Sequence, residues 1–159
     1  MTKAVSALDP AAVTADLDAA ADYGKKLPAA SGKLFVAGFC WGGGKSFLFA
    51  THRKDLSAAF VFYGTPPPTD ALKSITAPVY GFYAENDARI TASVASTTVD
   101  MKAAGKSYEP VIYGGAGHGF MRAGEDPNPD ANAAKNYAAN VAARKQGFQR
   151  LVRTLDSLR

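Results

Sequence analysis

Three side chains suited to nucleophilic catalysis occur in this chain, each shortly after an apolar run. Cys40 is the centre of the motif G-F-C-W-G, Asp87 follows the apolar run 79–84, and His118 follows the run 109–113. A cysteine thiol becomes an effective nucleophile when a histidine removes its proton, and that histidine needs an acid to fix its tautomer. The residue types and their order therefore predict a catalytic triad of Cys40, His118 and Asp87.

The segment around Cys40 has the sequence of a sharp turn from a strand into a helix. An apolar run at 34–37 precedes it, and a helical pattern at 45–50 follows it. We expect the flanking glycines to be required because strand and helix pass so closely that a Cβ would clash. Such a turn exposes its central side chain at the N-terminus of the helix, where the helix dipole favours a thiolate. A lone cysteine is otherwise more often a small buried hydrophobe, so the interpretation of Cys40 as a nucleophile depends on this turn.

Other residues compete for the acid and histidine roles. Glu85 lies in the same loop as Asp87, and we expect Asp87 to be the acid because it lies farther past the strand. His118 is bracketed by glycines, which is unusual for a core histidine, whereas His52 lies beside basic residues at a predicted helix end and is expected to cap it. Two distant histidines without a ligand cluster predict no metal site.

A second interpretation of the same segment is a phosphate-binding loop. Gly44-Lys45-Ser46 fits the end of the pattern G-x-x-x-x-G-K-[ST]. The pattern requires glycine at position 39, which is Phe39, and Gly38 is one residue too early. A nucleotide-binding domain is thus the weaker hypothesis, and a redox thiol protein is also disfavoured because the single cysteine has no resolving partner.

The predicted elements around these residues alternate between strands and helices. The apolar runs are continuous and mostly separated by helices, which indicates a parallel sheet with helices on both faces. In such a sheet, functional loops lie at the carboxyl ends of the strands. The expected strands are 34–39, 58–63, 79–84 and 109–113. The expected helices are 10–26, one that follows the turn around Cys40 and runs to about His52, one from a cap at Thr91 to about Ala104 with Gly105 closing it, and one from Asn128-Pro129 to the C-terminus.

The last of these helices carries an apolar stripe and one glycine. We expect the stripe to face the core and Gly147 to introduce a kink, since glycine costs about 1 kcal/mol in a helix. The stripe consists of Tyr137, Val141, Phe148, Leu151, Val152, Leu155 and Leu158.

Composition fits one soluble globular domain spanning residues 1–159. Hydrophobic residues make up 47% of the chain and charged residues 20%, with a net charge of +4. Lys and Arg are scattered, so no nucleic-acid partner is expected, although the small positive excess could favour an anionic substrate. We see no signal peptide and no membrane span, and one cysteine excludes an intrachain disulfide, so a cytoplasmic location is the default expectation.

Three motifs together resemble the dienelactone hydrolase family (carboxymethylenebutenolidases). They are GFCWGG at 38–43, END at 85–87 and HGF at 118–120, and the likeness runs from roughly Ala11 to the C-terminus. Nucleophile, acid, histidine is also the chain order of the α/β-hydrolase triad. The resemblance implies an α/β-hydrolase fold and hydrolysis of an enol-lactone or other small ester through an acyl-cysteine intermediate, without a cofactor.

The same resemblance assigns further roles. Cys40 would attack the carbonyl, His118 would move the proton and Asp87 would orient His118. The backbone N–H of Trp41, which follows the nucleophile, would donate to the oxyanion. Arg122, four residues past His118, matches a family arginine that binds a substrate carboxylate; the alternative is an exposed, solvated arginine.

The chain also departs from the family pattern. Family members are longer, and their preceding strands and loops supply a second oxyanion donor, a glutamate near the cysteine and further substrate-binding groups. With about four strands, the strand 34–39 would become an open apolar edge. We therefore predict an α/β-hydrolase-type fold truncated at its N-terminus. The alternative function is a weak or silent remnant whose sheet and oxyanion hole are completed by another copy or by a missing N-terminal segment.

Overall fold

The computed structural model describes residues 4–5, 7–122 and 133–158, with 133–136 described by their backbone alone. It divides into two compact units, Met1–Leu34 and Phe35–Arg159. The first unit holds helix α2 (Pro10–Lys25), which confirms the helix predicted at 10–26. Asp9 caps this helix, because its carboxylate accepts the backbone N–H groups of the second and third helical residues at 3.2 and 3.3 Å. Proline suits the first helical position, where no N–H is needed.

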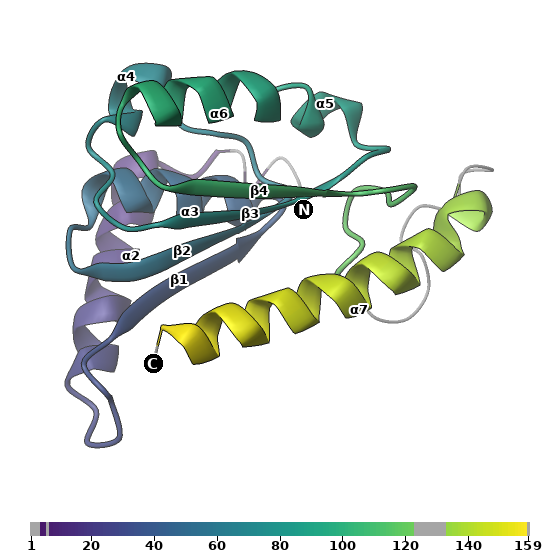
Figure 1. Ribbon diagram of the computed structural model, residues 1–159. Helices are drawn as coiled ribbons and strands as arrows, with labels where there is room; N and C mark the ends of the chain where they lie inside the picture. Colours follow the sequence, from purple (N-terminus) through teal and green to yellow (C-terminus); the bar gives the residue numbers. More distant parts are fainter. Residues whose placement is uncertain (1–3, 6, 123–132, 159) are drawn as a thin grey trace. The chain divides into compact units, whose positions relative to one another are not determined.

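A four-stranded sheet organises the second unit. The strand order is β1-β2-β3-β4, and β3 pairs in parallel with both β2 and β4. The arrow of β1 points in the same direction as the other three (Figure 1). All four predicted strands are confirmed, with ends shifted by no more than two residues: β1 is Leu34–Phe39, β2 is Leu56–Phe62, β3 is Val79–Ala84 and β4 is Tyr108–Tyr113.

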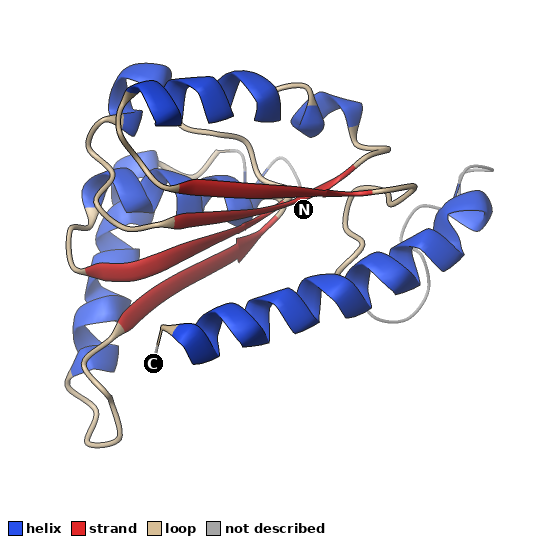
Figure 2. Ribbon diagram, in the orientation of Figure 1, coloured by secondary structure: helices blue, strands red, loops and turns tan. Residues whose placement is uncertain are grey.

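Helices cover both faces of this sheet, as the continuous apolar strands predicted. Figure 2 shows α4 (Thr69–Leu72), α5 (Ala88–Thr91) and α6 (Val94–Ala103) above the strands and α7 (Ala133–Ser157) below them. Helix α3 (Trp41–His52) packs on β2. Its Phe47 ring stacks on the Tyr108 ring at 5.6 Å, and the Tyr108 hydroxyl donates to the Tyr83 hydroxyl at 2.8 Å. Strands buried on both faces read as apolar runs rather than as an alternating pattern.

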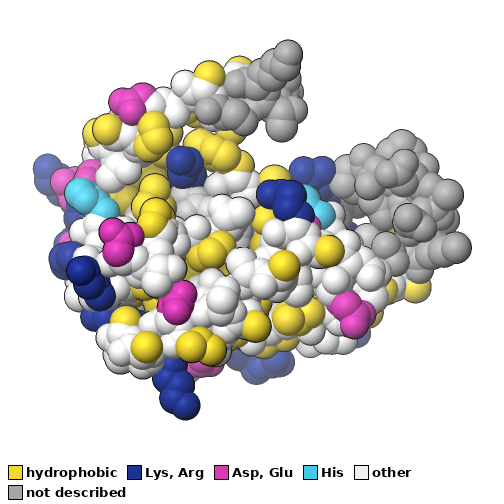
Figure 3. All heavy atoms as spheres, turned by 90° about the horizontal axis from the view of Figure 1, so that it is seen from above, with side chains coloured by type: hydrophobic (Ala, Val, Ile, Leu, Met, Phe, Trp, Pro, Cys, Tyr) yellow, Lys and Arg dark blue, Asp and Glu magenta, His cyan; other side chains and the backbone are white. Residues whose placement is uncertain are grey.

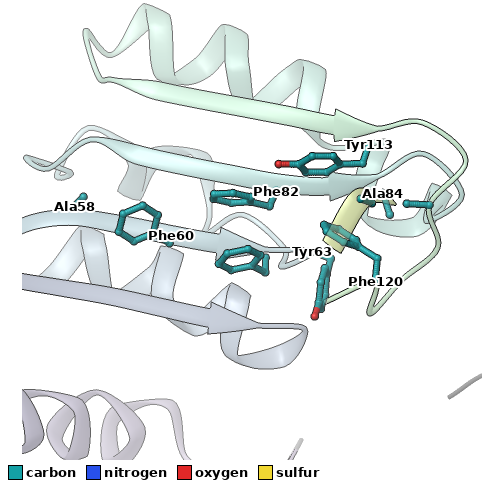
Figure 4. Close-up of a cluster of buried hydrophobic side chains, with 10 residues drawn as sticks. Ala58, Phe60, Tyr63, Phe82, Ala84, Tyr113 and Phe120 are labelled. Atoms are coloured by element: carbon teal, nitrogen blue, oxygen red, sulfur yellow. The ribbon is translucent and has the colours of Figure 1, made fainter. Parts of the chain in front are cut away.

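The core between the sheet and α7 is mainly aromatic (Figure 4). The rings of Phe62 and Phe82, on neighbouring strands, stack with centroids 4.2 Å apart, and Tyr113 and Phe120 extend the cluster toward the carboxyl ends of the strands. Aromatic pairs at this spacing add about 0.5–1.5 kcal/mol each beyond area burial. The cluster therefore provides a rigid floor under the loops that follow the strands.

Helix α7 buries a different face from the one predicted. The prediction that the apolar stripe faces the core is wrong for four of its residues, which are exposed. It is confirmed for Leu151, Leu155 and Leu158, which pack against the core. The exposed four are Tyr137, Val141, Phe148 and Val152. The helix continues through Gly147, where an added Cβ would lie 3.2 Å from Met121 Sδ. Gly147 thus permits close packing on the loop beneath it rather than a kink. The predicted start at Asn128-Pro129 lies outside the described residues.

The segment after β3 also differs from the prediction. Two helices, α5 and α6, replace the single helix expected from Thr91, and Ser93 occupies the position before α6. Thr91 lies inside α5, where its hydroxyl donates to the carbonyl of Ala84 at 2.7 Å. The C-terminal end was predicted correctly: Gly105, with φ of +67°, follows α6. The short helix α4 was not predicted.

Charged side chains are interspersed on the surface shown in Figure 3. Lys and Arg alternate there with Asp, Glu and apolar groups, which matches their scattered positions in the sequence. None of the helices formed by described residues combines the length and the apolar character needed to cross a bilayer.

Candidate active site

Cys40 lies at a strained turn between β1 and α3. Its φ of 56° and ψ of −119° place it in a region that residues other than glycine rarely adopt. Two backbone hydrogen bonds hold the turn: the N–H of Cys40 donates to the carbonyl of Phe62, at the end of β2, at 3.0 Å, and the N–H of Gly44 donates to the carbonyl of Cys40 at 3.2 Å. The strand-to-helix turn predicted from the sequence is therefore present.

The close approach of strand and helix depends on Gly38 and Gly43. An added Cβ at Gly38 would lie 1.9 Å from the carbonyl oxygen of Gly42, and one at Gly43 would lie 2.4 Å from that of Phe62. A Cβ at Gly42 would meet nothing within 4 Å. The expectation that both flanking glycines avoid a clash is thus right for Gly38 and wrong for Gly42. Residues 42–45 lie in the first turns of α3, which begins at Trp41, so the segment does not adopt a separate phosphate-binding loop.

The structure brings Cys40, His118 and Asp87 together in one chain of contacts. His118 Nδ1 lies 2.5 Å from Asp87 Oδ2, and His118 Nε2 lies 3.1 Å from Cys40 Sγ. Asp87 is buried and His118 is partly buried. A histidine held on one side by a carboxylate can accept a proton on the other side. The distances therefore suit transfer of a proton from the thiol to His118.

Glu85, the competing acid, has a different partner. Its side chain is exposed, and Oε2 accepts the backbone N–H of Gly115 at 2.7 Å. Asp87, two residues further from β3, is the carboxylate that reaches His118. The other histidine, His52, lies in the last turn of α3, at the opposite end from Cys40, and its ring packs against Phe49.

A hollow of about 300 Å³ opens beside the cysteine. It is lined by Phe39, Cys40, Tyr63, Met121 and Arg122. Its walls are thus largely apolar, and the guanidinium is the one charged group among these lining side chains. This volume is at the lower end of the range for small-molecule sites.

Trp41 does not line this hollow. Its side chain is exposed, and Lys45 Nζ lies 5.1 Å from the centre of its ring. Its backbone N–H belongs to the first turn of α3, whose N–H groups have no acceptor within the helix. That N–H group is therefore suited to an oxyanion next to Cys40.

Tyr63 lines the hollow, whereas its sequence position predicted only the end of a strand. It follows β2 with φ of 40°, a left-handed conformation that turns its ring toward the site. The edge-to-face contact with the His118 ring has a centroid distance of 5.0 Å. Burial raises the pKa of Tyr63 to about 12, although the nearby Arg122 guanidinium opposes the shift, so this group is a neutral phenol at physiological pH. The only feature of the sequence that could have indicated this role for Tyr63 is the Tyr-Gly pair that ends the apolar run.

A cysteine at a strand-to-helix turn, with an aspartate and a histidine on loops after later strands, is the arrangement typical of the α/β-hydrolase class. Comparison with known families agrees with this class: the sequence model of the Dienelactone hydrolase family matches residues 1–158. The chain belongs to the dienelactone hydrolase family. The resemblance found in the sequence motifs is confirmed.

Individual relatives are longer than this chain. It is 32% identical over 151 residues to the "Putative carboxymethylenebutenolidase" of Salmonella typhi, covering 88% of this chain and 52% of that protein. Its fold is similar to the crystal structure of the "Putative Dienelactone Hydrolase" from Klebsiella pneumoniae, with a TM-score of 0.69, 31% identity, and coverage of 89% of this chain and 64% of the other. Esterase PE8, at 16% identity and a TM-score of 0.61, shares the fold, with coverage of 80% and 59%. The chain thus spans about half the length of the curated relatives it matches.

Proposed function

We propose that the site hydrolyses a small ester or lactone with Cys40 as the nucleophile. The observation that carries this proposal is the continuous path from Cys40 Sγ through His118 to Asp87, at 3.1 and 2.5 Å. His118 Nε2 takes the thiol proton, and Asp87 holds Nδ1–H so that Nε2 is the basic nitrogen. Family membership supports hydrolysis as the reaction type.

Attack of Cys40 Sγ on the carbonyl carbon forms a C–S bond and leaves negative charge on the carbonyl oxygen. The N–H of Trp41 donates to that oxyanion. The intermediate then collapses, the C–O bond of the ester breaks, and His118 returns its proton to the departing alkoxide. Water, deprotonated by His118, then attacks the thioester carbonyl. The C–S bond breaks, the carboxylic acid is released, and His118 returns the proton to Cys40 Sγ, which restores the thiol.

The lining of the hollow supports a small, largely apolar acyl group with an anionic end. Phe39, Tyr63 and Met121 provide apolar walls, and Arg122 provides the positive charge. A guanidinium can bind a carboxylate with two parallel hydrogen bonds. We therefore propose a carboxylate-bearing ester or lactone as the substrate class, with Arg122 as its binding residue and no cofactor in the reaction.

Burst kinetics test the proposal. The purified chain is mixed with p-nitrophenyl acetate, and release of nitrophenol is followed from the first turnover. We expect a burst equivalent to one acyl group per chain, lost in Cys40→Ala and His118→Ala but retained in His52→Ala, the matched histidine variant. A burst of equal size in Cys40→Ala refutes the cysteine mechanism.

The exposed edge of the sheet favours an alternative function. β1 is the outermost of the described strands, and Phe39 on it is 48% exposed. Phe148 and Val152 on α7 are 58% and 40% exposed. Under this alternative, the chain is weak or silent until another chain covers these surfaces and completes the oxyanion hole, since losing one oxyanion donor costs about 10²–10³ in kcat.

Dilution distinguishes the two functions. A self-sufficient enzyme keeps a constant burst per chain and sediments as a monomer at all concentrations. An enzyme completed by a second copy loses specific activity on dilution, in step with dissociation seen by sedimentation velocity. Absence of a burst at every concentration, with a folded chain, favours the silent remnant.

A further inference from the structure

The loop that carries His118 has little rigidity of its own. Four of the six residues from 114 to 119 are glycines, and two of these, Gly115 and Gly119, have left-handed φ values of 68° and 82°. Glycine is the residue that loses most conformational freedom when it is ordered. His118 nevertheless lies within hydrogen-bond distance of two partners on two other loops. Contacts from outside the loop must therefore select this conformation.

One such contact comes from the loop that carries Asp87. Glu85 Oε2 accepts the N–H of Gly115 at 2.7 Å, and the Asn86 side-chain amide donates to the carbonyl of the same glycine at 3.0 Å. The backbone N–H of Asn86 also donates to the carbonyl of Ala116 at 2.8 Å. The loop after β3 and the loop after β4 are thus hydrogen-bonded to each other just ahead of Asp87 and His118, which contact each other.

A second contact comes from α7 on the other side of the loop. Asn140 Oδ1 accepts the N–H of Gly117 at 2.8 Å, and Gly117 directly precedes His118. Glu85, in the loop after β3, and Asn140, on α7, therefore bind two N–H groups of the same loop that lie two residues apart. Glu85 is exposed, so its side chain adds little apolar burial, and its short bond to an N–H is charge-assisted.

We propose that Glu85 and Asn140 form a two-point clamp that positions His118 for proton transfer. Neither touches the reacting atoms; both act through the backbone of residues 115–117. A shift of about 1 Å in a reacting group can cost about 100-fold in rate, so a loop of glycines needs such a clamp for catalysis even where the fold survives without it. The inference rests on the proposed function, because positioning matters only if His118 acts as the base.

Alkylation of the single cysteine reports this positioning without an ester. The full chain is treated with iodoacetamide across a range of pH, and modification of Cys40 is followed by mass spectrometry. Near neutral pH, we expect the part of the rate that depends on His118 to fall about tenfold in Glu85→Ala and in Asn140→Ala. The conservative variants Glu85→Gln and Asn140→Asp keep an acceptor oxygen, so their rates stay within about twofold of wild type.

Matched controls separate the clamp from general effects. Glu109→Ala removes an exposed glutamate on β4, and Gln149→Ala removes an exposed amide on α7; both keep the wild-type rate. Ester hydrolysis by the same variants should show a lower kcat with an unchanged KM, and the 1H resonance of His118 Nδ1–H should broaden or shift in the alanine variants alone. Equal rates in wild type and both alanine variants overturn the clamp, and so does a Glu85→Gln variant as slow as Glu85→Ala.

Failure of this inference differs from failure of the proposed function. Alkylation that depends on His118 but occurs without an ester burst contradicts the hydrolase proposal and leaves the clamp to be decided by its own variants. Wild-type alkylation that is identical to that of His118→Ala overturns both. Circular dichroism of each variant confirms that a slow rate belongs to a folded chain.

Discussion

Replacing Gly38 by alanine should damage both the stability and the reactivity of this protein. Gly38 is in β1, two residues before Cys40, where the strand passes against the start of α3. Gly42 lies at the same turn but faces open space. The variants Gly38→Ala and Gly42→Ala therefore add the same methyl group on two sides of Cys40, with opposite expected outcomes.

The size of the effect follows from the distances. The new Cβ at Gly38 would lie 1.9 Å from the carbonyl oxygen and 2.3 Å from the carbonyl carbon of Gly42, whereas such contacts are essentially never under 3.0 Å. All of these atoms are backbone, so strand and helix must separate by about 1 Å, and we expect a cost of about 3 kcal/mol, at the upper end for overpacking. At Gly42, alanine in a helix should stabilise by about 0.5–1 kcal/mol.

Two assays measure these effects. Urea denaturation gives the free energy of unfolding, and iodoacetamide alkylation gives the reactivity of Cys40 in the folded variants. A displacement of about 1 Å predicts an alkylation rate lower by about 100-fold in Gly38→Ala at neutral pH, and no more than a small change in Gly42→Ala. If Gly38→Ala is as stable and as reactive as Gly42→Ala, the reasoning about the close approach is refuted.

Three further predictions concern the hollow beside Cys40, a buried tyrosine and α7. Arg122→Gln should raise KM about tenfold for an ester that bears a carboxylate and leave a neutral ester unchanged, as measured by steady-state kinetics. Burial raises the pKa of Tyr83 to about 12, above its value of 10.0 in an unfolded chain. The unfolded state therefore loses this proton first, and stability falls as pH rises from about 10 to 12; urea titrations should show a smaller fall in Tyr83→Phe. Gly147→Ala should change stability by less than about 1 kcal/mol, since helix propensity offsets a shift of the flexible Met121 side chain.

The sheet could be predicted because its central strands, β2 and β3, are buried on both faces. Continuous apolar runs bounded by Gly and Pro locate such strands well, and parallel topology places their carboxyl ends at one edge. Cys40, Asp87 and His118 were expected together for that reason, and the structure brings them within hydrogen-bond distance. Their roles in catalysis remain the proposal made above.

Features set by tertiary contacts could not be predicted. Thr91 resembles a helix cap in sequence, but its hydroxyl bonds to the carbonyl of Ala84 instead. The buried face of α7 is decided by the loop that packs beneath Gly147, not by the most apolar stripe. The left-handed turn of Tyr63 and the bond from Glu85 to a glycine N–H depend on neighbours distant in sequence. No local pattern encodes such contacts.

The most direct test of the central claim is the mass of the protein during turnover. The chain is mixed with p-nitrophenyl acetate, quenched with acid within the burst, digested and analysed by mass spectrometry. The proposed mechanism predicts one acetyl group on the peptide that contains Cys40, formed quickly in wild type and slowly in His118→Ala. Ester hydrolysis without an acetyl group on Cys40 at any time would contradict the mechanism, and so would equal rates of acetylation in wild type and His118→Ala.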